Sequence, residues 1–282
     1  MSASLTPKSL ETPSGKHEGT ENFPVGSLLI RAGLRRHVHA FYRFARAADD
    51  IADNPLLDAA AKIAALDRFA AAVQGADDSE APAATAMYRS LQESNASPQH
   101  CLDLLTAFKR DATQLRYHDW DDLIDYCNFS AAPVGRYLLD LHGAPHSAWL
   151  ANDALCNTLQ IINHIQDCAD DYRALDRVYI PQDMLAAHGA SVAMLAEAKA
   201  PMALQQTLHD MLDRMAPMQE LARSFPRQIP ALRLRLETAI IVSLAESLTA
   251  VLRIRDPLSE NVKLSKTAKL HAVLFGLCCR VW

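Results

Sequence analysis

Two acidic segments, residues 42–53 and 160–171, constrain the fold of this chain more than any other part of its sequence. In each segment, four polar residues recur at spacings of three or four within a mostly apolar sequence. These residues are Tyr42, Arg46, Asp49 and Asp53 in the first segment, and Gln160, Asn163, Asp167 and Asp171 in the second. Such spacing places them on one face of an α-helix. A mostly apolar helix with one polar line is expected to be buried, with that line facing a cavity.

Two such helices facing each other would bring four carboxylates into one partly dry space. Isolated buried carboxylates are costly and like charges raise one another's pKa, so this arrangement requires cations. Oxygen ligands without a Cys or His cluster suit Mg²⁺, which leaves coordination positions for water and substrate phosphate. With Arg46 one turn before the carboxylates, we expect a Mg²⁺-dependent reaction in which diphosphate departs.

A simpler interpretation of each acidic segment stays open at this point. The spacing Asp-x-x-x-Asp also occurs on ordinary helices that face solvent, where it has no function. Two such segments on apolar helices, each with polar residues in register, favour the metal site over a solvated face.

The composition predicts an all-α protein. Hydrophobic residues make up 50% of the 282 residues, with only nine glycines. Residues 1–20 are polar and lack an apolar stretch, so we predict a disordered tail without a signal peptide, followed by one domain over 21–282. The net charge of −5 gives no electrostatic reason to expect a nucleic-acid partner. No uncharged apolar run approaches the roughly 20 residues that span a bilayer.

The cysteines and histidines do not indicate a metal site of their own. The six cysteines lack the Cys-x-x-Cys spacing, and we interpret them as reduced core thiols of a cytoplasmic protein. The eleven histidines lack metal-ligand spacing, and we interpret them as structural.

Apolar periodicity predicts the order of the helices. We expect them over residues 35–53, 59–74, 99–116, 119–142, 147–172, 202–223, 229–254 and 263–279. Pro133 can break the fourth of these near Val134, where a ligand would meet bare backbone, although an ordinary turn fits equally well.

Two further features leave alternatives open. Arg177 and Tyr179 can reach a phosphate, or they can form a surface pair. The last helix, 263–279, has a basic start and an apolar, aromatic end. It can touch a membrane surface or pack against the domain, and packing is the preferred interpretation.

Three segments in this order resemble the squalene/phytoene synthase family: 44–53 (FARAADDIAD), 163–171 (NHIQDCADD) and 177–181 (RVYIP). Two shorter strings, 21–25 (ENFPV) and 42–46 (YRFAR), resemble its bacterial branch in the hopanoid pathway. The resemblance spans about residues 21–266. It implies a single-domain isoprenoid-synthase helical bundle around a central cavity.

The resemblance also implies roles for individual residues. It places Mg²⁺ and diphosphate among Asp49, Asp53, Asn163, Asp167 and Asp171, and it implies that Arg46 and Arg177 bind the diphosphate. The reacting carbons would lie beside Tyr42, Gln160 and Tyr179. Other substrate contacts would come from Asn22 and Phe23. Arg46, Tyr42 and Tyr179 are the expected catalytic residues, and Val134 at the helix break is a further candidate for substrate binding. The family usually has Glu where Asp170 stands, and the charge is retained.

The implied reaction converts presqualene diphosphate and water to hydroxysqualene and diphosphate. Another head-to-head prenyl synthase, which makes presqualene diphosphate, squalene or phytoene, is the nearest alternative. A non-catalytic helical subunit that has kept the fold is a second one. The oily product leaves peripheral membrane association open for an otherwise cytoplasmic enzyme.

Overall fold

A computed structural model of the chain describes residues 30–281. The predicted tail and the predicted substrate residues Asn22 and Phe23 lie outside the described residues. Within the described part the only strand-like pairing is an isolated bridge between Arg116 and Val178, so the predicted all-α class is confirmed. The helices fall into two compact units, divided after Thr113, and each is described by itself.

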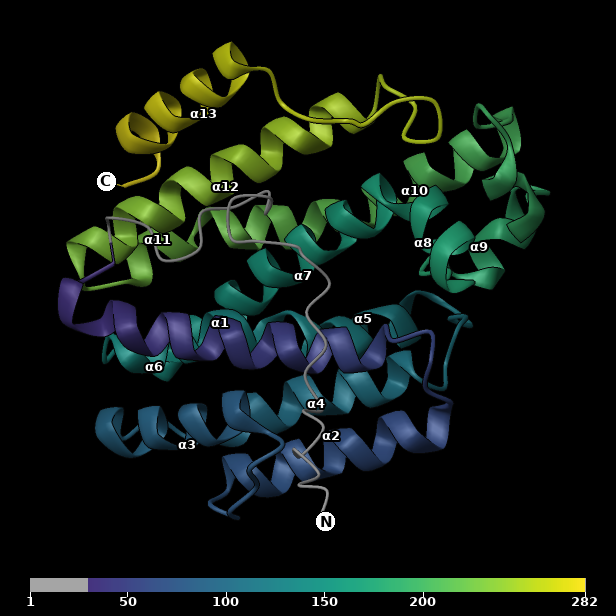
Figure 1. Ribbon diagram of the computed structural model, residues 1–282. Helices are drawn as coiled ribbons and strands as arrows, with labels where there is room; N and C mark the ends of the chain where they lie inside the picture. Colours follow the sequence, from purple (N-terminus) through teal and green to yellow (C-terminus); the bar gives the residue numbers. More distant parts are fainter. Residues whose placement is uncertain (1–29, 282) are drawn as a thin grey trace. The chain divides into compact units, whose positions relative to one another are not determined.

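The first unit packs its first helix against the other three (Figure 1). Its helices are α1 (Ala32–Ala52), α2 (Ala59–Val73), α3 (Pro82–Ser94) and α4 (Gln99–Asp111). The apolar face of α1 buries Phe44 completely, and its ring lies 6.0 Å from that of Phe69 on α2. Asp58 caps α2, because its carboxylate accepts a hydrogen bond from the Ala61 N–H at 2.8 Å.

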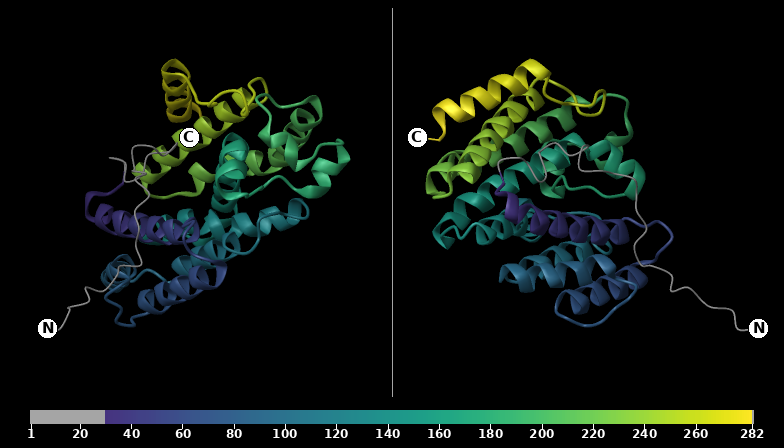
Figure 2. Two further views of the ribbon diagram at one scale, coloured as in Figure 1. Left: turned by 45° about the vertical axis from the view of Figure 1, so that its right-hand side comes forward. Right: turned by 60° about the vertical axis from the view of Figure 1, so that its left-hand side comes forward.

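The second unit is arranged around α7, which contacts α5, α6, α10 and α12 (Figures 1 and 2). Its α-helices are α5 (Trp120–Ser130), α6 (Ala132–Leu141), α7 (Trp149–Gln166), α8 (Cys168–Leu175), α9 (Gln182–Ala187), α10 (Met202–Arg223), α11 (Phe225–Gln228), α12 (Leu232–Leu252) and α13 (Lys266–Cys279); η2 (His146–Ala148) and η3 (Val192–Ala196) are short 3₁₀ helices. Ile161 and Ile162 of α7 are fully buried, so this helix forms the centre of the unit's core.

Two predicted helices divide in the structure. The predicted break near Val134 is present, because α5 ends at Ser130 and α6 begins at Ala132 with Pro133 in its first turn, where proline is tolerated. The α6–α7 approach is close there: a Cβ on Gly135 would lie 2.0 Å from the Asn152 side-chain oxygen. The prediction of one helix over 147–172 is wrong, since α7 and α8 meet at Asp167.

The last helix, α13, packs one face along α12, so the preferred interpretation of this helix is confirmed (Figures 1 and 2). The two backbones meet at Gly276, where an added Cβ would lie 2.6 Å from the Ala239 carbonyl oxygen. Cys278 and Cys279 at the end of α13 are exposed, so the prediction of core thiols is wrong for these two.

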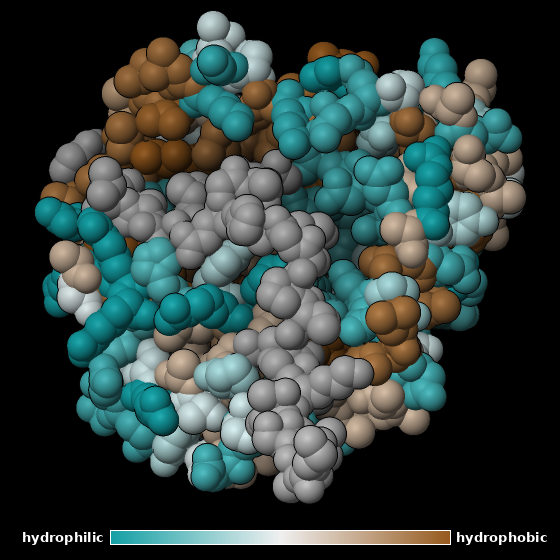
Figure 3. Space-filling view, viewed as in Figure 1, coloured by the Kyte–Doolittle hydropathy of each residue, from teal (hydrophilic) through white to brown (hydrophobic). Residues whose placement is uncertain are grey.

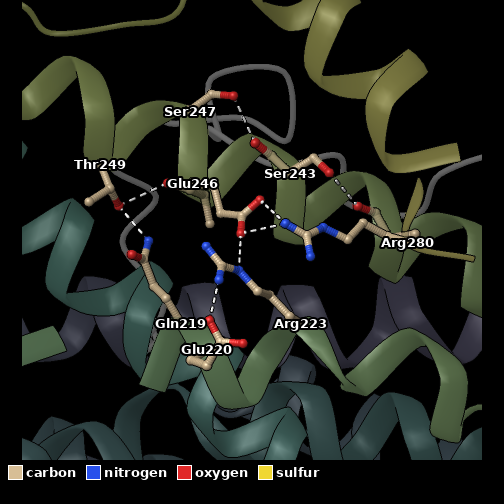
Figure 4. A network of polar contacts seen from close by, with 10 residues as sticks. Gln219, Glu220, Arg223, Ser243, Glu246, Ser247, Thr249 and Arg280 are labelled. Carbon is tan, nitrogen blue, oxygen red and sulfur yellow. Dashed lines mark hydrogen bonds and ion pairs between the residues drawn. The ribbon is translucent and has the colours of Figure 1, made fainter. Parts of the chain in front are cut away.

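A charged cluster fixes the end of this helix (Figure 4). The Glu246 carboxylate on α12 accepts a hydrogen bond from Arg223 Nε of α10 at 2.5 Å. Arg280, just after α13, donates to both oxygens of the same carboxylate at 2.8 and 2.9 Å. Glu246 therefore links three helical segments through charge-assisted hydrogen bonds.

Replacing Gly276 with Ala is expected to destabilise the protein. The methyl group would meet backbone, which cannot rotate away, and overpacking typically costs about 1–3 kcal/mol, against a gain of up to about 1 kcal/mol in helix propensity. Urea unfolding followed by circular dichroism measures the change. Gly33→Ala on α1 is the matched control, because nothing lies within 4 Å of its added Cβ. Equal stability of the two variants would contradict this packing.

Within residues 30–281, no helix is both long enough and apolar enough to cross a membrane.

Candidate functional site

The first acidic segment lies on α1 and forms a network around Arg46. Tyr42, Arg46, Asp49 and Asp53 are all half-buried, and the Asp53 N–H donates to the Asp49 carbonyl oxygen at 2.9 Å, which keeps the helical register to the end. The Arg46 guanidinium lies 2.8 Å from an Asp49 carboxylate oxygen and 2.8 Å from one of Asp50. The structure therefore confirms the predicted polar line and adds Asp50 to it.

These contacts set the charge state of Arg46. Burial opposes its charge, but the attraction of Asp49 and Asp50 outweighs burial and raises the pKa of Arg46 above its usual value. The Asp50 carboxylate is buried, with 6% of its side chain exposed, whereas that of Asp49 has 29%. Asp50 thus orients Arg46 from the protein side, while Asp49 retains access to solvent.

The second acidic segment keeps its register through the break between α7 and α8. The Asp167 N–H donates to the Asn163 carbonyl oxygen at 2.9 Å, and the Asp171 N–H donates to that of Asp167 at 2.8 Å. Both are the i to i−4 bonds of an α-helix. Asp167 is exposed, whereas Gln160, Asn163 and Asp171 are half-buried. The predicted polar line is therefore present and reaches solvent at Asp167.

Arg177 and Tyr179 follow this segment directly and are brought back against it. Asp176 adopts a left-handed conformation with φ 51°, which turns the chain after α8. The Arg177 N–H then donates to the Asp171 carbonyl oxygen at 3.3 Å. Both side chains are buried, each 6% exposed, and Arg177 Nη1 donates to the Tyr179 hydroxyl at 3.5 Å. The alternative of a surface pair is therefore wrong.

A buried aromatic cluster surrounds Tyr179. The His164 ring stacks on the Tyr179 ring with centroids 3.6 Å apart and planes inclined by 17°. The ring of Tyr126 lies 5.3 Å from that of Tyr179, and Tyr117 stacks on the same ring at 5.4 Å. Tyr126 and Tyr179 also share a hydroxyl–hydroxyl contact of 3.4 Å. This packing fixes the Tyr179 ring. The sequence interpretation had assigned no role to Tyr117 or Tyr126, and it had treated His164 as structural.

Burial, with a smaller contribution from Arg177, lowers the pKa of His164 to about 3. The imidazole is therefore neutral at physiological pH, and Arg177 is the cation of this cluster. A signal for His164 was present in the sequence, because it directly follows Asn163 in the acidic motif. Its burial was not visible in the sequence pattern.

His164 should make the protein sensitive to acid. Its folded pKa of about 3 lies below its ordinary 6.5, so the unfolded chain binds this proton first as pH falls below about 6.5. The contribution of neutral His164 to the free energy of unfolding is fully present above that pH and is lost as the pH falls towards 3. At about pH 5 this loss amounts to about 2 kcal/mol. Comparing urea unfolding at about pH 8 and about pH 5 should show that His164→Leu loses about 2 kcal/mol less than the natural chain. Equal losses would contradict a buried neutral His164.

Each unit has partly accessible oxygen donors of the kind that Mg²⁺ binds. The candidate donors are Asp49 and Asp53 of the first unit, and Asn163, Asp167 and Asp171 of the second. Within residues 30–281, no three His, Cys, Asp or Glu side chains gather closely enough to hold an ion by themselves. Mg²⁺ commonly takes only one or two carboxylates and completes its coordination with water and phosphate oxygens, so these donors suit it.

Val134 lies in the first turn of α6 and is 39% exposed. It is therefore accessible to a ligand.

A family model described as squalene/phytoene synthase matches residues 16–268. Among curated proteins, the chain is 46% identical over 254 residues to a hydroxysqualene synthase of Rhodopseudomonas palustris, covering 90% of this chain and 87% of that one. It is 42% identical over 271 residues to a hydroxysqualene synthase of Zymomonas mobilis, covering 95% and 91%. Phytoene synthases match with lower identity, such as that of Pseudescherichia vulneris at 30% over 213 residues, covering 71% of this chain and 68% of that one.

Solved structures show the same fold. The squalene synthase HpnC from Alicyclobacillus acidocaldarius superposes with a TM-score of 0.71 at 30% identity, covering 81% of this chain and 86% of that one. A dehydrosqualene synthase in complex with a ligand superposes with a TM-score of 0.74 at 20% identity, covering 91% and 90%.

Proposed function

Because the chain belongs to the squalene/phytoene synthase family, we propose that it converts presqualene diphosphate and water to hydroxysqualene and diphosphate with Mg²⁺ as cofactor. The observation that carries this proposal is the identity of 42–46% to three hydroxysqualene synthases over at least nine tenths of the chain. The accessible oxygen donors and the two arginines beside them are consistent with it. A cytoplasmic location and a place in hopanoid synthesis remain predictions.

The two arginines and the acidic residues bind the diphosphate end of the substrate in this proposal. Arg46 contacts the diphosphate while Asp50 holds its guanidinium, and Arg177 and Asn163 are further diphosphate contacts in this proposal. Asp49, Asp53, Asn163, Asp167 and Asp171 would hold Mg²⁺, which would supply positive charge to the leaving group. These residues stabilise the charge that develops as the carbon–oxygen bond breaks and the diphosphate keeps the electron pair.

A second group of residues contacts the carbon skeleton of the substrate in this proposal. The cyclopropylcarbinyl cation rearranges beside Tyr42, Gln160 and Tyr179, with Asn22, Phe23 and Val134 as further substrate contacts. The face of an aromatic ring attracts a cation, and the half-buried Tyr42 ring can contribute in this way. Because His164 is neutral, it adds no positive charge beside the Tyr179 ring. A water oxygen then bonds to the cation and releases its proton, which gives the alcohol.

Two alternatives compete with this reaction. A head-to-head synthase that forms presqualene diphosphate, squalene or phytoene would use the same family fold, and phytoene synthases match at 26–30% identity. A non-catalytic subunit is the second alternative. The retained arginines and acidic residues, with their charges paired or exposed to solvent, favour an enzyme over that subunit.

Incubating the purified protein with Mg²⁺ and presqualene diphosphate, without NADPH, tests the proposal by mass spectrometry of the lipids. We expect hydroxysqualene, and no product when EDTA removes the metal. A parallel incubation with farnesyl diphosphate tests the alternative of a head-to-head synthase that forms presqualene diphosphate. Presqualene diphosphate formed there, with no alcohol from either substrate, would assign the chain to the first step instead. The absence of any product from either substrate would favour the non-catalytic subunit.

A further inference from the structure

The outer face of α13 is apolar and exposed. Leu270, Leu274 and Cys278 follow one another at intervals of four residues, so they form a line along the helix. Leu270 is 60% exposed and Leu274 is 54% exposed, and Phe275 beside them is 40% exposed. The space-filling view shows hydrophobic residues gathered where α13 lies in Figure 1 (Figure 3). We call these exposed side chains of α13 the outer face.

Positive charge accompanies this apolar line. Lys263, Lys266 and Lys269 are exposed, and Lys266 lies one turn before Leu270 on the same line. From residue 261 to residue 281 the chain contains no Asp or Glu, although its net charge is −5. None of the three lysines has an ion-pair partner within residues 30–281. The region therefore combines exposed leucines with cations that no carboxylate of residues 30–281 neutralises.

The opposite face of α13 is held by the protein, which fixes the direction of the outer face. Gly276 meets the backbone of α12 at Ala239, and Arg280 is bonded to Glu246. The helix cannot turn its leucines inward without losing both contacts. Its 14 residues measure about 21 Å, shorter than the roughly 30 Å hydrocarbon layer of a bilayer. The helix is therefore suited to lie in the plane of a membrane surface and is too short to span the bilayer.

We propose that the outer face of α13 binds the surface of an anionic lipid bilayer. Leu270, Leu274 and Phe275 enter the boundary between headgroups and acyl chains, while the lysines contact the negatively charged headgroups. Charge complementarity selects this partner, because anionic headgroups carry the negative charge that residues 261–281 lack. The binding depends on α13 alone, so it stands independently of the proposed reaction.

Flotation of the full-length protein with lipid vesicles tests the proposal. We expect binding to vesicles of phosphatidylglycerol and phosphatidylcholine, weaker binding at about 0.5 M salt, and little binding to phosphatidylcholine alone. Leu270→Glu/Leu274→Glu should lower binding at least about tenfold, because each glutamate removes an inserted side chain and adds a repelled charge. Both positions are exposed, and circular dichroism checks that the variant folds.

Leu150→Glu is the matched control, because Leu150 on α7 is 69% exposed and outside the outer face. This variant should bind vesicles as the natural chain does. Lys266→Glu/Lys269→Glu should lose binding to anionic vesicles while leaving the leucines in place. The absence of vesicle binding, or binding that all three variants share, would overturn the proposal. Self-association that is lost only in the leucine variant, without vesicle binding, would identify a dimer interface instead.

Discussion

Replacing Asp49 or Asp167 with Asn is expected to lower the rate of hydroxysqualene formation about 100-fold to 1000-fold. Asn keeps the size of the side chain and one of its oxygens but removes the negative charge that attracts the cation. Neither change should greatly alter folding, because Asp167 is exposed and the Asp49 carboxylate is 29% exposed. Product formation from presqualene diphosphate, measured by mass spectrometry against Mg²⁺ concentration, gives the effect.

Asp170→Asn is the matched control within the same motif. Its side chain is 87% exposed and its ion-pair partner within residues 30–281 is Arg173, at 3.7 Å, so we expect little change in activity. A second readout is the rise in melting temperature on adding Mg²⁺ with inorganic diphosphate, which the Asp49 and Asp167 variants should lose. Full activity in both variants would refute the metal site.

Replacing Arg46 with Gln is expected to reduce both stability and activity. The change removes a guanidinium that lies 2.8 Å from the buried Asp50 carboxylate. Loss of one partner from a buried ion pair typically costs about 3–5 kcal/mol, and the 18% exposure of Arg46 reduces this to about 2–3 kcal/mol. Loss of a diphosphate contact should also lower activity about 100-fold. Urea unfolding and product formation measure the two effects.

The double variant Arg46→Gln/Asp50→Asn separates these effects. Neutralising Asp50 relieves the buried charge, so most of the lost stability should return. Activity should stay low, because the guanidinium that contacts the diphosphate is still missing. Recovery of activity together with stability would show that Arg46 acts only as a structural partner of Asp50.

The helical framework was largely predictable because apolar periodicity and breaker residues are local signals. The predicted helix over 202–223 matches α10, and Pro133 marked the division between α5 and α6. The division at Asp167 was not predictable, since neither Gly nor Pro occurs between residues 160 and 171. The register survives because the i to i−4 hydrogen bonds on both sides of Asp167 are kept.

The parts of the site that were missed depend on burial. Asp50 lies four residues after Arg46, a spacing that allows an ion pair, yet only the fold shows that its carboxylate is buried. His164 lies within the acidic motif, but stacking on Tyr179 requires the turn at Asp176. The same turn buries Arg177, for which the sequence permitted a surface position equally well. Sequence spacing thus identified which residues share a helix face, and tertiary packing decided which became buried.

The attachment of Arg280 to Glu246 has a practical consequence for anyone who handles this protein. Val281, the next residue, is only 1% exposed. A bulky label attached at residue 281 would therefore disturb a buried side chain next to a charged cluster that links three helical segments. Such a label would strain the same hydrogen bonds that hold α13, so a probe for measuring stability should be attached elsewhere.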